Sequence, residues 1–238
     1  MMRPVGDRRA TAVAVPPRRL GTVEPASRRI VRGVGWALIG AGAVVLLYVA
    51  YLLWFTGLQT ATAQRDLADR FETITEGRGA PTAEPPAAGR SSEAAGDAFA
   101  ALWFERDRER VVTDDVLYVV EGTSVEDLKR GPGYYVGSAL PGQSGNFAIA
   151  GHRTTYGAPF WSLNALAEGD TIHVVDRNGT EWRYAFREQR IVEPTDVWVV
   201  SDADPIGLGA PTITLTTCHP RASAAQRLVV FGELVGSV

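Results

Sequence analysis

One long apolar run constrains this chain more than any other feature of its sequence. Residues 33–55 read GVGWALIGAGAVVLLYVAYLLWF, without a single charge. A helix over this run, at ~1.5 Å per residue, reaches roughly 34 Å and can cross a bilayer core of ~30 Å. A cleaved signal peptide has a shorter apolar region that ends in small residues, whereas this run ends in large ones. We therefore predict an uncleaved transmembrane anchor over residues 33–55.

The charges beside this run predict its orientation. Residues 1–32 contain many arginines and only two acidic residues, Asp7 and Glu24, whereas both signs are mixed after the run. Loops rich in Lys and Arg stay in the cytoplasm. We expect a single-pass protein of the cell membrane, with residues 1–32 as a disordered, Arg- and Pro-rich cytoplasmic tail and everything after residue 56 outside.

The remaining chain divides into a spacer and a folded domain. Residues 59–75 are compatible with a short helix, and residues 77–96 are rich in Ala, Pro and Gly without apolar periodicity. Residues 56–97 are therefore interpreted as an extracellular spacer. The catalytic domain is predicted at 98–238, about 140 residues, which is a common domain size. A net charge of −3 gives no reason to expect a nucleic acid as partner.

The predicted domain is mainly β, with short apolar runs separated by Gly, Pro, Asn and Asp. Asp176-Arg177-Asn178-Gly179 is expected to form a type I′ hairpin turn, and residues 124–130 a short helix. Because an open sheet leaves edges exposed, we expect a closed β-barrel of about eight strands with short helices. The strand candidates are 116–120, 146–150, 171–176, 181–191, 212–217 and 227–234.

Cys218 is the single cysteine of the chain, so no intramolecular disulfide can form. An unpaired cysteine in an exported protein is a reactive thiol, an intermolecular partner or a small buried hydrophobe. The run TITLTTCHP places it at the end of a predicted strand, immediately before Pro220 stops the strand. A strand end is a rigid mount for a nucleophile.

Two further residues occupy similar positions. His152 follows the apolar strand NFAIAG, where it can act as a general acid or base. Arg227 opens the run RLVVFGEL, close enough to Cys218 along the chain for the two strands to be antiparallel neighbours. A thiolate that attacks a carbonyl, an imidazolium that protonates the leaving amine and a cation that stabilises the oxyanion form a coherent set.

Three segments resemble the sortases, most closely those of class E, in order over roughly residues 116–235. They are GPGYYVGSALPGQSGNFAIAGHRTTYGAPFWSLNALAEGDTI, VEPTDVWVV and TLTTCHPRASAAQRLVVFGEL. The sortase signature TLxTC falls on residues 214–218, its following Arg on Arg227, and its GH-type loop on His152. The forms TLTTCHP and AGHRTTYGAPF are similar to class E in particular.

The resemblance implies a sortase barrel and a cysteine transpeptidase that uses no metal or cofactor. Such an enzyme cleaves the C-terminal sorting signal of a surface protein between Thr and Gly. It forms a thioester on Cys218, which the amine of a lipid-linked peptidoglycan precursor resolves. His152 would be general acid and then base, and Arg227 would bind substrate and steady the oxyanion. Class E implies LAxTG-like signals rather than LPxTG, with Tyr135, Thr217 and Leu215 as candidate substrate-binding residues.

The sequence also departs from the family pattern. The L-x-IPxI opening strand is replaced by ALWFERDRERVVTDDVLYVV at 101–120, which leaves the first strand's position open, and Tyr134 stands where a His is usual after GPG. His219 is interpreted as structural or supporting, and His173 as a side chain of the pleated sheet. Both remain outside the predicted catalytic set.

Three alternatives remain open. A pilin-polymerising sortase typically has an Asp-Pro-aromatic lid and often a C-terminal membrane helix, but Asp204-Pro205-Ile206 lies late in the chain and lacks the aromatic residue. A catalytically degenerate sortase-like scaffold is motivated by the altered first strand. A cysteine L,D-transpeptidase is disfavoured because its SHGC-type signature is absent from the sequence.

Overall fold

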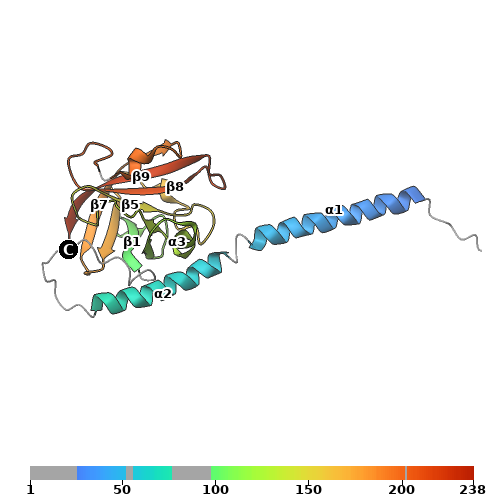
Figure 1. Ribbon diagram of the computed structural model, residues 1–238, viewed down its shortest axis with the longest axis horizontal. Coiled ribbons are helices and arrows are strands. Elements are labelled where there is room, and N and C mark those ends of the chain that lie inside the picture. The colour runs from blue at the N-terminus through green and yellow to red at the C-terminus, as the bar shows by residue number, and fades with distance from the viewer. Residues whose placement is uncertain (1–25, 52–55, 77–97, 202) are drawn as a thin grey trace, which may run out of the picture. The chain divides into compact units, whose positions relative to one another are not determined.

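The computed structural model describes residues 26–51, 56–76, 98–201 and 203–238 (Figure 1). It separates into two compact units, one ending at Leu46 and one running from Leu47 to Val238. Residues 1–25 of the predicted tail and residues 77–97 of the predicted spacer lie outside the described residues. The elements are α1 (Ala26–Ala50), α2 (Thr56–Glu76), β1 (Ala98–Arg106), β2 (Glu109–Arg110), β3 (Leu117–Glu121), α3 (Val125–Arg130), β4 (Gly133–Tyr134), β5 (Asn146–Ala150), η2 (Leu163–Ala165), β6 (Thr171–Asp176), β7 (Glu181–Val192), η3 (Val197–Val200), β8 (Thr212–His219) and β9 (Gln226–Ser237).

Helix α1 is the one described helix that is long and apolar enough to cross a membrane, by length and composition. It begins at Ala26, before the predicted start at Gly33. The added turns contain Arg28, Arg29 and Arg32, and Arg is a strong helix former, so the helix continues beyond the apolar run. The predicted disordered tail is therefore too long by residues 26–32.

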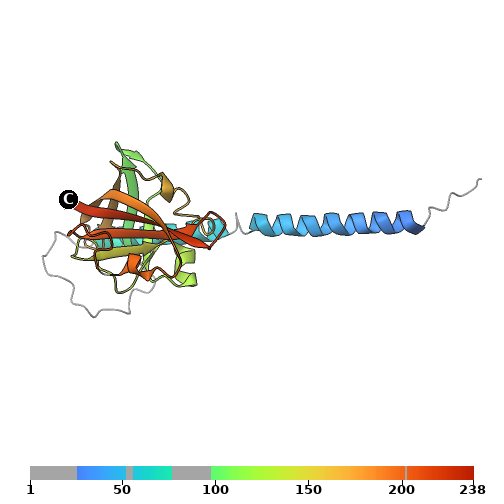
Figure 2. The ribbon, with the colours of Figure 1, turned by 90° about the horizontal axis from the view of Figure 1, so that it is seen from above.

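Eight strands form a closed barrel in the order β1-β3-β4-β5-β8-β9-β7-β6. Figure 2 shows the strands from above. Pairing between β1 and β6, from Ala100↔Asp176 to Glu105↔Thr171, closes the ring. The short strand β2 pairs with the end of β1 outside this ring. The predicted closed barrel of about eight strands with short helices is confirmed.

The predicted strands match β3 and β5 to β9, but β1, β2 and β4 were not predicted. β1 reads AFAALWFER, and Ala is depleted in strands while its last residues are charged. Only pairing with both β3 and β6 makes this segment a strand. The short helix α3 was predicted, and its N-cap Ser124 forms a reciprocal capping box with Asp127.

The hairpin between β6 and β7 lies where it was predicted, but its turn type is different. Of its four residues only Gly179 has a positive φ, of 83°. Its N–H donates to the Asp176 carbonyl at 3.0 Å. A type I′ turn would need positive φ at both central residues, Arg177 and Asn178, whereas a single left-handed Gly after the turn is typical of a three-residue loop with a bulge.

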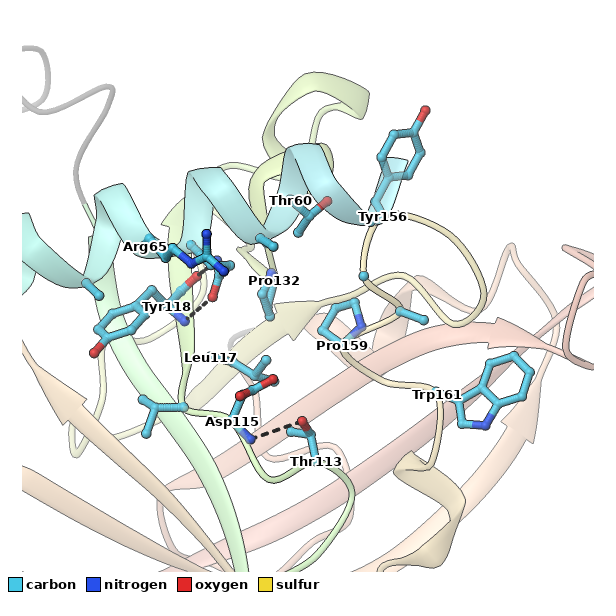
Figure 3. Close-up of a pocket in the computed structure, with 18 of the residues that line it drawn as sticks. Thr60, Arg65, Thr113, Asp115, Leu117, Tyr118, Pro132, Tyr156, Pro159 and Trp161 are labelled. Carbon is cyan, nitrogen blue, oxygen red and sulfur yellow. Dashed lines mark hydrogen bonds between the residues drawn. The ribbon is translucent and has the colours of Figure 1, made fainter. Parts of the chain in front are cut away.

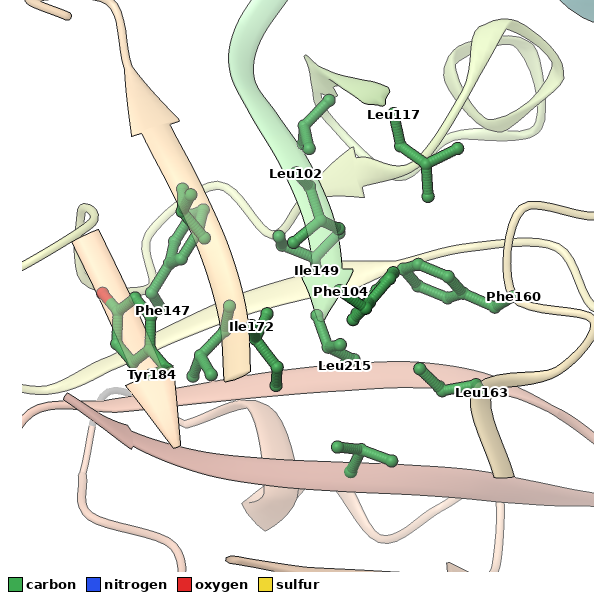
Figure 4. Packing of buried hydrophobic residues seen from close by; sticks show 14 of the residues in the cluster. Leu102, Phe104, Leu117, Phe147, Ile149, Phe160, Leu163, Ile172, Tyr184 and Leu215 are labelled. Atoms are coloured by element: carbon green, nitrogen blue, oxygen red, sulfur yellow. The ribbon is translucent and has the colours of Figure 1, made fainter. Parts of the chain in front are cut away.

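The inside of the barrel is filled by large apolar side chains from every side of the ring (Figure 4). On β8 these are Ile213 and Leu215, which have no exposed surface, and on β9 they include Val230. Because strand side chains alternate between faces, Thr214, Thr216 and Cys218 belong to the outer face of β8.

Helix α2 packs against the outside of the barrel rather than standing apart from it. Leu67 and Phe71 are 1% and 5% exposed and form an apolar cluster with Ala98, Ala101 and Val120. The compact unit that holds the barrel therefore includes α2, whereas the predicted domain began only at residue 98.

The Gln64 side chain fastens α2 to strand β3. Its Oε1 accepts from the Tyr118 N–H at 2.8 Å. Its Nε2 donates to the Tyr118 carbonyl at 2.8 Å and to the Arg130 carbonyl at 2.9 Å. The amide thus satisfies both backbone groups of Tyr118 as a neighbouring strand would. The contact needs Gly131, because a Cβ there would lie 2.2 Å from Nε2.

Candidate active site

Cys218 lies one residue before the end of β8, in the middle of three neighbouring strands. β8 runs parallel to β5 and antiparallel to β9. The thiol is half-buried and free. Threonines fill the strand up to this point, so β-branched residues hold it extended until Pro220. A thiol at this point is fixed by the sheet and still reachable.

His152 and Cys218 follow the same end of two paired parallel strands. The last pair of the β5–β8 ladder is Ala150↔Thr216, so each residue stands two positions beyond it. The ladder is extended by the Gly151 N–H, which donates to the Thr216 carbonyl at 3.0 Å. The Thr217 hydroxyl donates to the Gly151 carbonyl at 2.7 Å. These two bonds tie the backbone before His152 to the backbone before Cys218.

Arg227 pairs directly with Cys218 across the β8–β9 ladder. Directly opposed residues of an antiparallel pair point to the same face of the sheet. The Arg227 Nη1 donates to the carbonyls of Ala224 and Gln226, each at 3.0 Å, within its own turn. The structure thus brings the three predicted catalytic residues to one end of the β5–β8–β9 group.

The imidazole of His152 is partly shielded from solvent. It is half-buried, its ring lies against the Tyr156 ring with centroids 4.9 Å apart, and burial lowers its pKa below the ordinary value of 6.5. Its Nε2 is buried and has no hydrogen-bond partner among the described residues. The neutral imidazole is therefore favoured at pH 7, and one ring nitrogen is available to a substrate or to a thiol proton.

The three predicted substrate-binding residues lie in different places. Tyr135 is half-buried, and its hydroxyl bonds to the Thr216 hydroxyl at 3.0 Å, on the same face of β8 as Cys218. Thr217 is 3% exposed, and its hydroxyl is used by Gly151. Leu215 has no exposed surface and belongs to the barrel core. The prediction for Leu215 is wrong, because its side chain points to the inner face and offers no surface to a substrate. The Thr217 hydroxyl supports the backbone that leads into the His152 loop.

Asn146 was not predicted from the sequence as a residue that supports the site. Its side chain makes four hydrogen bonds. Its Nδ2 donates to the carbonyls of Val199 and Ser201 at 3.1 and 3.0 Å. Its Oδ1 accepts from the hydroxyls of Thr212 and Thr214. Asn146 thereby fixes the η3 segment over the outer face of the strands that carry Cys218. A polar residue opening an apolar strand was the available signal.

The loop after His152 also contacts helix α2. The Tyr156 N–H donates to the Thr56 hydroxyl at 3.4 Å, and Gly157 lies close to Thr60. A cavity of about 580 Å³ lies between α2, the segment before β3 and this loop (Figure 3). The imidazole is therefore linked through Tyr156 to a helix far away in the sequence.

The other two histidines lie in surroundings consistent with their predicted supporting roles. His173 is 8% exposed, stacks on Trp103 and sits between the carboxylates of Glu181, at 2.8 Å, and Glu105, at 3.4 Å. His219 is half-buried at the end of β8, opposite Gln226, and no described residue bonds to its buried Nδ1.

Comparisons with known proteins identify the family. The sortase domain matches residues 112–235. Two relatives from Streptomyces coelicolor are sortase SrtE1, 31% identical over 86% of this chain, and sortase SrtE2, 31% identical over 85%. This chain spans 57% of the length of SrtE1 and 81% of that of SrtE2.

Solved structures give the same result. Sortase E from Streptomyces avermitilis matches with a TM-score of 0.52 and 35% identity, covering 59% of this chain and 90% of that one. Sortase E1 from Streptomyces coelicolor, solved with a tripeptide in its active site, gives a TM-score of 0.50 and 30% identity, covering 61% and 93%. The chain therefore belongs to the sortase family, and these relatives support its place in class E.

Proposed function

We propose that the protein is a membrane-anchored cysteine transpeptidase that cleaves C-terminal sorting signals and joins surface proteins to a peptidoglycan amine. The observation that carries this proposal is the meeting of Cys218, His152 and Arg227 at one end of three paired strands. Family membership supports the reaction class, and the half-buried Cys218 thiol can be reached by a peptide.

The proposed first step forms a thioester. Neutral His152 takes the Cys218 proton as the sulfur attacks the Thr carbonyl of the Thr–Gly bond. Arg227 and nearby backbone donors hold the oxyanion. The imidazolium then protonates the leaving Gly amine. In the second step His152 takes a proton from the incoming amine, which attacks the thioester and releases the Cys218 thiol.

The proposed signal is LAxTG in preference to LPxTG. Class E relatives support it, as does Tyr135 beside Thr216 on the face of β8 that carries Cys218. We further propose that α1 anchors the protein in the cell membrane as a single span with its arginine-rich N-terminal side in the cytoplasm. The excess of arginine before the span supports this orientation.

The test is a mass-spectrometric assay of the full chain in detergent, with LAxTG and LPxTG peptides and triglycine as acceptor. We expect cleavage after Thr, transfer to triglycine and faster turnover of LAxTG. Cys218→Ala should abolish both products while leaving the folded state intact. Cleavage that persists in Cys218→Ala would contradict the proposal, and peptide binding without turnover by the wild type would favour a non-catalytic scaffold.

A further inference from the structure

Two guanidinium groups converge on the same two neutral acceptors beside the candidate active site. Arg153 donates from Nε to the Trp161 carbonyl at 3.2 Å and from Nη2 to Asn164 Oδ1 at 2.7 Å. Arg221 donates to the same carbonyl from Nε at 3.3 Å and from Nη2 at 3.2 Å, and reaches Asn164 Oδ1 at 3.5 Å. The Arg221 guanidinium also stacks on the Trp161 ring at 4.3 Å.

Neither cation pairs with an Asp or Glu carboxylate in the part of the chain that the structure describes, although Cys218 lies near enough to Arg153 to act on its charge. Arg153 is 4% exposed, and its buried Nη1 has no hydrogen-bond partner there. Burial and, after it, the charge of Arg221 lower the pKa of Arg153, and the nearby Cys218 offsets only part of this. A buried charge is normally paired, and two like charges sharing neutral acceptors repel each other. An anion between them would relieve both costs.

The two arginines line a cavity of about 640 Å³ that has room for such an anion. Asn164, Gln189 and His219 also line it, and no Asp or Glu does so among the described residues. Arg190 lines it as well, but its guanidinium is already paired with the Glu188 carboxylate. The cavity is therefore cationic, with its positive charge concentrated on Arg153 and Arg221, while Ile191, Pro220 and Leu228 give it an apolar part.

The wall of the cavity contains the chain neighbour of each candidate catalytic residue. Each of them is followed in the chain by a residue of its wall: His152 by Arg153, Cys218 by His219, and Arg227 by Leu228. Because strand side chains alternate, His219 and Leu228 belong to the face opposite to that of Cys218 and Arg227. An acceptor held in this cavity would therefore have to extend around the end of β8 to reach the Cys218 thioester, which leaves the outer face of the strands for the sorting signal.

We propose that this cavity binds an anionic group of the acceptor substrate, so that Arg153 and Arg221 hold the acceptor while its amine attacks the Cys218 thioester. The inference rests on the proposed function and names the chemistry of its second substrate. Either of two anionic groups on an acceptor could bind to the two guanidinium groups. One is a carboxylate of its peptide, and the other is a phosphate of a lipid carrier. The order of the reaction requires the acceptor to approach a site already occupied by the acyl group.

The first test compares acceptors that differ in charge. Full-length protein in detergent is given an LAxTG peptide with triglycine, triglycinamide or 2-aminoethyl phosphate, and the ratio of transfer to hydrolysis is measured. Arg221→Gln should lower this ratio for triglycine by about tenfold, which corresponds to one lost charge-assisted hydrogen bond. The ratio for triglycinamide and the rate of hydrolysis should stay unchanged, and Arg221→Lys should restore part of the loss.

The matched control is Arg190→Gln, which changes another arginine of the same cavity whose charge is already paired. It should leave the preference for triglycine intact. A stronger Arg221-dependent preference for 2-aminoethyl phosphate than for triglycine assigns the site to phosphate, and the reverse assigns it to carboxylate. An equal fall for triglycine and triglycinamide in Arg221→Gln would overturn the proposal.

A second test needs no turnover and separates this inference from the proposed function. Inorganic phosphate, compared with potassium chloride of equal ionic strength, should raise the Tm of the wild type and of Arg190→Gln but not that of Arg221→Gln. A Tm that phosphate leaves unchanged in the wild type, or raises equally in Arg221→Gln, refutes the anion site whatever the peptide assay gives. An inactive protein that shows the Arg221-dependent shift contradicts only the proposed function.

Discussion

The Gln64 side chain is expected to contribute more to stability than its position on a helix outside the barrel suggests. Gln64→Ala removes three hydrogen bonds and leaves the N–H and C=O of Tyr118 without those partners. At about 1 kcal/mol for each net hydrogen bond, the loss is about 3 kcal/mol. The better helix propensity of Ala returns only about 0.4 kcal/mol. The net loss of about 2.6 kcal/mol corresponds, for a domain of this size, to a fall in Tm of roughly 5–10 °C.

The matched control is Thr62→Ala on the same helix. Thr62 is exposed, and its hydroxyl bonds only to the Leu58 carbonyl of its own helix. Thermal unfolding of the full chain in detergent, followed by circular dichroism, compares the two variants with the wild type. Thr62→Ala should lie within about 0.5 kcal/mol of the wild type, as surface substitutions usually do. If Gln64→Ala is equally mild, α2 does not depend on this amide for its docking.

The remaining predictions concern the site and its supports. Cys218→Ala should lose all labelling by a thiol alkylator, because it is the single cysteine, and should unfold at a Tm close to that of the wild type. Because burial lowers the pKa of His152, protons bind the unfolded state first, so stability should fall as pH drops below about 6.5; urea titrations of His152→Asn should lack that part of the slope. Asn146→Ala should release the η3 segment and raise KM for the sorting peptide more than it lowers kcat, which steady-state kinetics would measure; a change in kcat alone would contradict this role. Tyr184→Phe removes the hydroxyl that accepts from the Gly142 N–H at 2.8 Å and should lower the free energy of unfolding, measured with denaturant, by about 1–2 kcal/mol. In the wild type, burial raises the pKa of the Tyr184 phenol to about 12, so the phenol should not ionise below that pH.

The strands that could be predicted are those whose own sequence favours a strand. β5, β6 and β8 are rich in apolar or β-branched residues and are bounded by turn residues, so local pattern located them. β1 is Ala-rich and becomes a strand by pairing on both sides, while β4 has only two residues. These strands depend on contacts distant in sequence, which a local pattern does not contain.

The strand-end positions of the three candidate catalytic residues could be predicted, but the contacts that support these positions could not. Cys218, His152 and Arg227 each stand at a strand end, and the family motifs singled them out. The Gln64 amide at β3 and the contact of Thr56 with Tyr156 join residues 54 and 100 positions apart. Neither residue type predicts such a contact, because Gln and Thr also occur on exposed helix faces.

The parallel pairing of β5 with β8 is the feature on which the proposed chemistry depends most. Antiparallel neighbours would place the end of one strand beside the start of the other, whereas parallel strands end together. Here the two ends carry His152 and Cys218, and the Thr217 side chain joins them by donating its hydroxyl to the Gly151 carbonyl at 2.7 Å. β9 then returns antiparallel, so its first residues, including Arg227, meet the same end. A thiol, an imidazole and a guanidinium are thus gathered by strand direction alone, and the loops beyond them remain free to vary around a fixed centre.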